Sequence, residues 1–101
     1  MSPSPAPLVI LATATARPGM EGDLEQALLE VVEPTLAQPG CLGFELLQSP
    51  DRTAITGIER WASDEAHNHH LQGDHVTKLM ARFEGILAAP PVILPMRPLS
   101  R

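Results

Sequence analysis

The sequence predicts one α+β domain whose strands and helices follow each other in the order βαββαβ. Segments with continuous or alternating apolar residues, typical of strands, flank segments whose apolar residues recur every three or four positions, as on one helix face. Turns rich in glycine and proline separate these segments. The 101 residues are enough for one hydrophobic core and too few for two independent ones.

The N-terminal part of the chain predicts a lead-in followed by a buried strand. Residues 1–7 alternate proline with small residues, and we expect a flexible N-terminus there, with the single domain spanning residues 8–101. Residues 8–16 are β-branched and apolar on both faces before they become small and polar. This pattern is typical of a strand in the centre of a sheet.

A first helix is expected to begin near Glu21, because a turn at residues 17–19 is followed by acidic side chains that favour a helix N-terminus. Pro34 removes one amide hydrogen bond within the helical pattern, so we expect a kink or an early end there. The apolar stripe predicted to face the core comprises Leu24, Ala27, Leu28, Val31, Val32, Thr35 and Leu36.

A hairpin is predicted after this helix. Residues 41–48 alternate Leu42, Phe44 and Leu46 with smaller or polar residues, and residues 54–61 form a second strand of similar length. The turn between them has the sequence Ser-Pro-Asp-Arg. The lone Cys41 excludes an internal disulfide and is read as a small apolar residue at a strand start.

The C-terminal half predicts a broken helix and an edge strand. Ser63 can cap a helix, and the break at Gly73 allows Asp74 to cap a second segment. The second segment carries an apolar stripe of Val76, Leu79, Met80, Phe83, Ile86 and Leu87. Residues 92–94 are restricted by neighbouring prolines to a strand at a sheet edge or on a partner.

This element order predicts a ferredoxin-like fold with an antiparallel four-stranded sheet. Helices on one face would leave the other face bare, although the strands are apolar on both faces. We therefore expect something to cover the second face.

The composition limits the partners and the cellular location that we expect for this protein. The net charge is −5 and the seven basic residues are scattered, so we expect no nucleic-acid partner. No apolar run is long enough to span a bilayer, and the N-terminus lacks the pattern of a signal peptide, so we expect a cytoplasmic protein without a membrane partner.

Four motifs occur in an order and spacing that resemble the antibiotic biosynthesis monooxygenase (ABM) family and the related small quinol monooxygenases. These motifs are Arg17-Pro18-Gly19, Pro39-Gly40-Cys41-Leu42-Gly43-Phe44-Glu45, Glu59-Arg60-Trp61-Ala62-Ser63 and His70-Leu71-Gln72-Gly73-Asp74-His75. The resemblance implies a homodimer, a dimeric α/β barrel in which two sheets face each other. It also implies a pocket for a small aromatic or apolar ligand between each sheet and its helices.

The family includes cofactor-free oxygenases, haem-degrading enzymes and isomerases. The positions that correspond to the haem-degrading signature hold Thr13, His70 and Met80, so the resemblance does not extend to that branch. Several monooxygenase relatives have a tyrosine where this chain has Phe44, so a phenolic acid or anchor is absent there.

All four histidines lie within residues 67–75, at His67, His69, His70 and His75. His67 and His70 share a helix face, which suits metal ligands or a hydrogen-bonded pair, but a third ligand is not evident and no metal or other cofactor is predicted. His70 and His75 match the recurrent histidines of the family and are the predicted catalytic bases, with structural capping as the alternative.

Five further residues are predicted to contact substrate. Trp61 could wall a pocket, Glu59 could orient a histidine, and Asn68 or Arg60 could hold an oxygen of the substrate. Phe44 completes this set.

The predicted function is a cofactor-independent monooxygenase that oxidises a quinol-like or polyketide-type aromatic with O₂. Two alternatives remain open: a non-catalytic or stress-associated domain that binds a small ligand, and an isomerase that uses the same pocket.

Overall fold

The computed structural model describes residues 7–100; most of the expected flexible lead-in, residues 1–6, lies outside them. The elements are β1 (Leu8–Thr15), α1 (Glu21–Leu29), α2 (Val32–Leu36), β2 (Cys41–Gln48), β3 (Ala54–Trp61), α3 (Asp64–Leu71), α4 (Asp74–Ile86) and β4 (Val92–Met96). None of the helices in this part of the chain is both long and apolar enough to cross a membrane.

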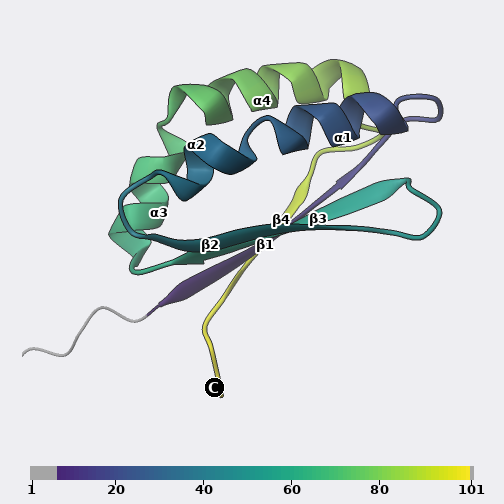
Figure 1. The fold of residues 1–101 in the computed structure, drawn as a ribbon. Helices are drawn as coiled ribbons and strands as arrows, with labels where there is room; N and C mark the ends of the chain where they lie inside the picture. Colours follow the sequence, from purple (N-terminus) through teal and green to yellow (C-terminus); the bar gives the residue numbers. More distant parts are fainter. Residues whose placement is uncertain (1–6, 101) are drawn as a thin grey trace, which may run out of the picture.

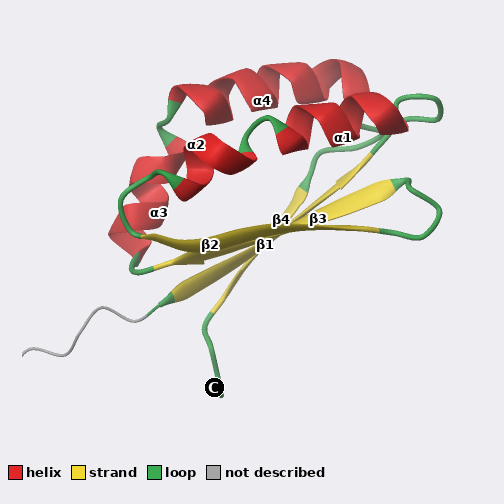
Figure 2. Cartoon of the chain, in the orientation of Figure 1, coloured by secondary structure: helices red, strands yellow, loops and turns green. Residues whose placement is uncertain are grey.

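The strands form one sheet in the order β2-β3-β1-β4, and every neighbouring pair is antiparallel. The predicted ferredoxin-like topology is confirmed, with β1 in the interior of the sheet and β4 at an edge. Figure 1 shows the helices lying together over the sheet. In Figure 2 the described helices lie on one side of the sheet, and its other side is uncovered.

The first helical region breaks earlier than the sequence predicts. α1 ends at Leu29 and α2 begins at Val32, so the helix has the expected early end, but at residues 30–31, one turn before Pro34. Pro34 is the third residue of α2, where a backbone amide has no partner within the helix, so its missing N–H removes no helical hydrogen bond. Leu36, which was expected in the core, is exposed.

Two further expectations are corrected by local geometry. The pairing of β2 with β3 shifts register between Cys41 and Gly43, and this irregularity leaves Leu42 exposed instead of buried beside Phe44. The N-cap of α4 is Gly73, and Asp74 is the first helical residue, where its charge still favours the helix N-terminus.

The main core packs α1 and α4 against the inner face of the sheet. Its buried members are Ala14, Ala16, Leu24, Ala27, Leu28, Ile55, Phe83, Ile86 and Leu87. A smaller cluster at the other end of the sheet joins Leu8, Ile10 and Trp61. The inward-facing residues of β1 are alternate ones, because successive side chains of a strand point to opposite faces.

The uncovered outer face of the sheet is apolar. Leu94 of β4, Leu11 of β1 and Ile58 of β3 are directly opposite one another and form a row across three strands. Their odd-even position places them on the face away from the helices. Beside this row, the hydroxyls of Thr13 and Thr56 form a hydrogen bond of 2.8 Å, which satisfies the central polar groups of this face.

The placement of the core gives the first prediction. Leu28→Asp or Phe83→Asp would bury an unpaired carboxylate, at a cost of several kcal/mol, and is expected to abolish folding. Leu29→Asp is the matched control, because this neighbouring leucine is 62% exposed and the same change there should alter stability little. Thermal melts followed by circular dichroism measure both effects; a Leu28→Asp protein with an unchanged melting temperature would show that the core is misplaced.

Candidate active site

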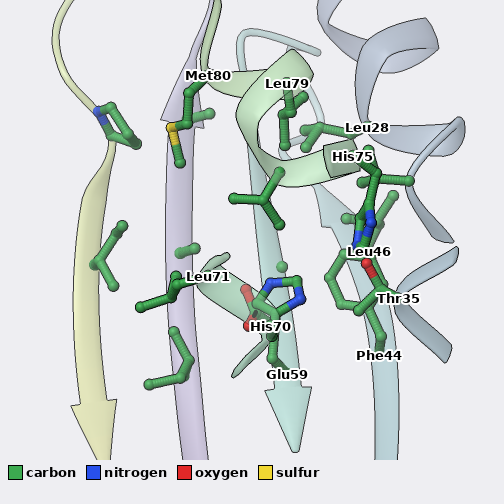
Figure 3. A pocket seen from close by; sticks show the side chains of 18 of the residues that line it. Leu28, Thr35, Phe44, Leu46, Glu59, His70, Leu71, His75, Leu79 and Met80 are labelled. Atoms are coloured by element: carbon green, nitrogen blue, oxygen red, sulfur yellow. Dashed lines mark ion pairs between the residues drawn. The ribbon is translucent and has the colours of Figure 1, made fainter. Parts of the chain in front are cut away.

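A cavity of about 160 Å³ lies between the inner face of the sheet and the helices (Figure 3). Most of its wall is apolar and comes from residues that also belong to the core or border it, including Leu28, Leu46, Ile55, Val76, Leu79 and Phe83. The lining residues Leu71, Met80 and Ile93 are exposed and mark its open side. Met80, expected in the core, therefore borders the opening.

Polar side chains gather at the other end of this cavity. Glu59 of β3, His67 and His70 of α3, His75 of α4 and Thr35 of α2 line it. His70 is 6% exposed and Thr35 is 1% exposed, so these groups are withdrawn from bulk water. The lining residues within the described chain include no lysine or arginine.

Local sequence positions the histidines of α3. The hydroxyl of Ser63 accepts a hydrogen bond of 3.1 Å from the backbone N–H of Ala66, which fixes the start of the helix, as predicted. From that start, residues three positions apart share a face, so His67 and His70 both reach the cavity. Their ring centroids are 6.1 Å apart.

Gly73 separates α3 from α4 and allows His75 to approach the same region. A Cβ atom at position 73 would lie 3.0 Å from Cε1 of His75 and 3.3 Å from Nε2 of Gln38, so the absence of a side chain permits both to pack here. Nε2 of His75 is buried and has no hydrogen-bond partner among the described residues. A buried ring nitrogen without a partner is costly, and it is the group best suited to meet a polar atom of a ligand.

Glu59, Trp61, His70 and Gln38 form a connected polar chain. The indole Nε1 of Trp61 donates a hydrogen bond of 3.0 Å to Oε1 of Glu59. Nε2 of His70 lies 3.6 Å from the same oxygen, and Nδ1 of His70 is within hydrogen-bond distance of Oε1 of Gln38. The Trp61 and His70 rings also pack together, with centroids 4.7 Å apart.

Burial determines the protonation of the two titratable members of this set, Glu59 and His70. Burial raises the pKa of the Glu59 carboxyl above its usual value, and the Trp61 hydrogen bond only partly offsets this. Burial lowers the pKa of His70 to about 4, with smaller contributions from His75 and His67. We conclude that burial outweighs the attraction between the two groups, because their separation exceeds that of a hydrogen bond; His70 is therefore neutral at pH 7.

The structure brings some of the predicted site residues together and leaves others out. His70, His75, Glu59 and Phe44 line the cavity. Phe44 lies over Gly57, where a Cβ would be only 3.1 Å from its ring. Trp61 is fully buried behind Glu59 and lines the cavity at no point, so it holds the carboxylate instead of forming a wall.

Asn68 and Arg60 are the predicted site residues that the structure does not bring into the cavity. Both side chains are exposed. Arg60 alternates with Glu59 along β3 and therefore projects from the opposite face of the sheet. Asn68 follows His67 on α3 and is turned away from the helix face that carries His67 and His70.

Sequence reasoning missed Gln38 and Thr35. Gln38 belongs to the connection between α2 and β2, where no periodic pattern indicates a functional side chain. Thr35 was assigned to the core stripe and is buried, but it also lines the cavity.

Within residues 7–100, no group of three or more histidine, cysteine, aspartate or glutamate side chains has an arrangement that could hold a metal ion.

Comparison with known proteins gives a consistent match. The family model described as "Antibiotic biosynthesis monooxygenase" matches residues 7–82. Rv0793 of Mycobacterium tuberculosis is 27% identical over 95 residues, which cover 94% of each chain. The solved structure of Rv0793 aligns with a TM-score of 0.90 over 95% of this chain and 98% of that one. The crystal structure of PA3566 from Pseudomonas aeruginosa has 31% identity and a TM-score of 0.90, covering 98% of this chain and all of its own.

The lowered pKa of His70 predicts the pH at which its ring gains a proton in the folded protein. The folded protein should keep His70 neutral until the pH approaches about 4, whereas an unfolded imidazole protonates near pH 6.5. NMR of the ring resonances should give this low midpoint; a midpoint at or above 6.5 would contradict the neutral state.

The same shift affects stability in a defined direction. As the pH falls, the imidazole of His70 is protonated in the unfolded chain before it is protonated in the folded protein. The contribution of neutral His70 to the free energy of unfolding is therefore fully present above pH 6.5 and is lost as the pH falls towards 4. The stability of the wild type relative to His70→Asn should therefore fall by about 3 kcal/mol between pH 7 and pH 4. Urea unfolding at each pH measures the difference.

Proposed function

The chain belongs to the antibiotic biosynthesis monooxygenase family, and from this premise we propose that it oxidises a quinol-like or polyketide-type aromatic with O₂ and without a bound cofactor. The observation that supports the proposal is the cavity itself, which combines an apolar wall with a buried polar end. Such a site can hold a flat hydrocarbon body and direct one oxygen-bearing edge at acid–base groups.

The proposed reaction requires two functions from the site. An electron-rich aromatic reacts with O₂ after it loses a proton, so the site must take that proton and stabilise the resulting anion in a water-poor environment. The buried ring nitrogen Nε2 of His75 is proposed to hydrogen-bond the substrate oxygen. His70, whose ring centroid lies 5.6 Å from that of His75, is one of the acid–base residues at this end of the cavity. For a naphthoquinol, one oxygen atom enters the ring as a hydroxyl on the naphthoquinone and the other leaves as water.

Cavity size restricts the substrate. A cavity of about 150 Å³ accommodates a benzene-sized ligand, and this cavity measures about 160 Å³. One ring therefore fits inside, and a second ring would extend towards Leu71 and Met80 at the open side.

The proposal predicts faster O₂ consumption by 1,4-dihydroxynaphthalene with the protein than without it, measured with an oxygen electrode and no added flavin, haem or metal. Ala12→Leu should abolish the acceleration, because Ala12 lines the cavity and a larger side chain would fill it. Ala81→Leu is the matched control, since Ala81 is exposed on α4 and does not line the cavity.

Chelator treatment should leave the rate unchanged. Ligand binding with no turnover for any electron-rich aromatic would favour the alternative of a non-catalytic binding domain. Conversion of the ligand without O₂ uptake would favour the isomerase alternative.

We also propose that two copies pair through the uncovered faces of their sheets to form a dimeric α/β barrel. The apolar row of Leu94, Leu11 and Ile58, with the neighbouring exposed Val92 and Met96, supports this pairing. An apolar sheet face of this kind is unusual on a soluble monomer, and a second copy of the same face is the partner that symmetry supplies most simply.

The pairing predicts a particle of twice the 10.9 kDa chain mass in light scattering coupled to gel filtration. Leu94→Glu should yield a folded monomer, because it places a charge in the middle of the proposed contact. Leu99→Glu should remain dimeric, since Leu99 is fully exposed in the segment after β4. A wild-type monomer at micromolar concentration would exclude the barrel.

A further inference from the structure

The cavity contains a carboxylate whose role the preceding proposal leaves open. The Glu59 side chain is 13% exposed and belongs to the lining of an otherwise largely apolar cavity. Placing a carboxylate there is unfavourable unless its contacts compensate. It therefore differs from the exposed glutamates of the helices.

The contacts of Glu59 anchor one oxygen and leave the other available. Oε1 accepts the hydrogen bond from Trp61 and faces Nε2 of His70 at 3.6 Å. Oε2 makes no hydrogen bond with the described residues. The carboxylate is thus held in place from behind by the fully buried indole of Trp61, while Oε2 can meet a ligand.

Gln38 determines which ring nitrogen of His70 carries the proton, and therefore how His70 interacts with the Glu59 carboxylate. The amide oxygen of Gln38 can only accept a hydrogen bond, so Nδ1 of His70 must carry the ring proton. Nε2 then has a free lone pair directed towards Glu59. In this tautomer Nε2 of His70 donates no hydrogen bond to Glu59, so His70 does not stabilise the anionic carboxylate and leaves it a stronger proton acceptor.

The surroundings favour the carboxylate over the imidazole as the proton acceptor. The titratable groups that line the cavity with Glu59 are His67 and His70 from α3 and His75 from α4, and the charge of Glu59 also acts on the thiol of Cys41 from β2. Burial strengthens the basicity of a carboxylate and weakens that of an imidazole, and the directions of the Glu59 and His70 pKa shifts agree with this rule.

We infer that Glu59, and not a histidine, takes the proton from the substrate, and that Gln38 is a positioning residue that acts on it through His70. The inference rests on the proposed function. In the step, an O–H or activated C–H bond of the substrate breaks, its electron pair stays on the substrate as an anion, and an O–H bond forms at Oε2 of Glu59. After O₂ has added to a ring carbon, the proton on Glu59 returns to the outer peroxide oxygen, which leaves as water with the hydrogen of that ring carbon as its second hydrogen.

Proton removal can be tested without oxygenation. The probe is 2-tetralone, a bicyclic ketone whose hydrogens at the carbon between ring and carbonyl exchange with D₂O through an enolate, followed anaerobically by NMR. The wild type should accelerate the exchange at least about tenfold over buffer, and Glu59→Gln should lose that acceleration. Glu65→Gln is the matched control, because this exposed glutamate of α3 does not line the cavity.

The outcomes are distinguishable. Exchange by a protein that consumes no O₂ with any aromatic would overturn the oxygenase proposal and leave the inference intact. Wild-type exchange no faster than buffer, or Glu59→Gln that exchanges at the wild-type rate, would overturn the inference. If Glu59→Gln fails to fold, Glu59→Asp serves instead: it retracts the carboxylate by one methylene and should lower the rate, and an unchanged rate would equally overturn the inference.

The role of Gln38 has its own readout in the ligand-free protein. Nitrogen NMR should identify His70 as the Nδ1–H tautomer in the wild type. Gln38→Leu removes the acceptor and should shift His70 to the Nε2–H form and lower the exchange rate several-fold, while Gln38→Glu retains an acceptor and should rescue both. An Nε2–H tautomer in the wild type, or an unchanged spectrum in Gln38→Leu, would overturn this assignment.

Discussion

The alternation of side chains along β3 is the constraint on which the core and the site both depend. β3 pairs with β2 on one side and β1 on the other, so its inward-facing residues lie on the floor of the space beneath the helices. Those residues are Ile55, Gly57, Glu59 and Trp61. Ile55 joins the main core, Trp61 the smaller cluster, and Glu59 lies between them with its carboxylate in the cavity. A register slip of one residue would turn all four to the outer face.

The cavity exists because the packing above β3 is incomplete in specific places. Gly57 contributes no side chain, and a Cβ there would come as close as 3.1 Å to the Phe44 ring. The helical layer is also broken twice, at residues 30–31 and at Gly73. The second break turns the chain between α3 and α4, so that His70 from one helix and His75 from the next approach within 5.6 Å between ring centroids. One continuous helix would not bring these two positions together in this way.

Electrostatics determines which ligand groups suit the polar end of the cavity. With no lysine or arginine among the described lining residues, neither the carboxylate nor a ligand anion has a full positive charge beside it. Burial therefore raises the pKa of Glu59 and lowers that of His70, and hydrogen bonds from Trp61 and to Gln38 hold the two side chains in place. Such a site suits a neutral hydroxyl or carbonyl better than a permanently charged group.

The element order, the sheet and most of the core could be predicted from the sequence, because they follow from short-range patterns. The apolar run of β1, the period-two pattern of β2, the helical stripe from Val76 to Ile86 and the Ser63 cap are each visible within a dozen residues. The clustering of His70 and His75 was visible for the same reason. The position of the helix break was predicted less well: Pro34 indicates a kink or an early end, and the break lies at residues 30–31.

Which polar residues share one site depends on the packing of segments that are distant in the sequence. Gln38 is 32 positions from His70 in the chain, and Glu59 is 11 positions from it; no local period relates either pair. Their meeting depends on how the α2–β2 connection and α3 pack over β3. The same packing excludes Arg60 and Asn68, adjacent in sequence to site residues, because a strand and a helix turn neighbouring side chains in different directions. Protonation was equally undecided before the fold was known, because the pKa values of Glu59 and His70 are displaced by burial, which is a property of the assembled core.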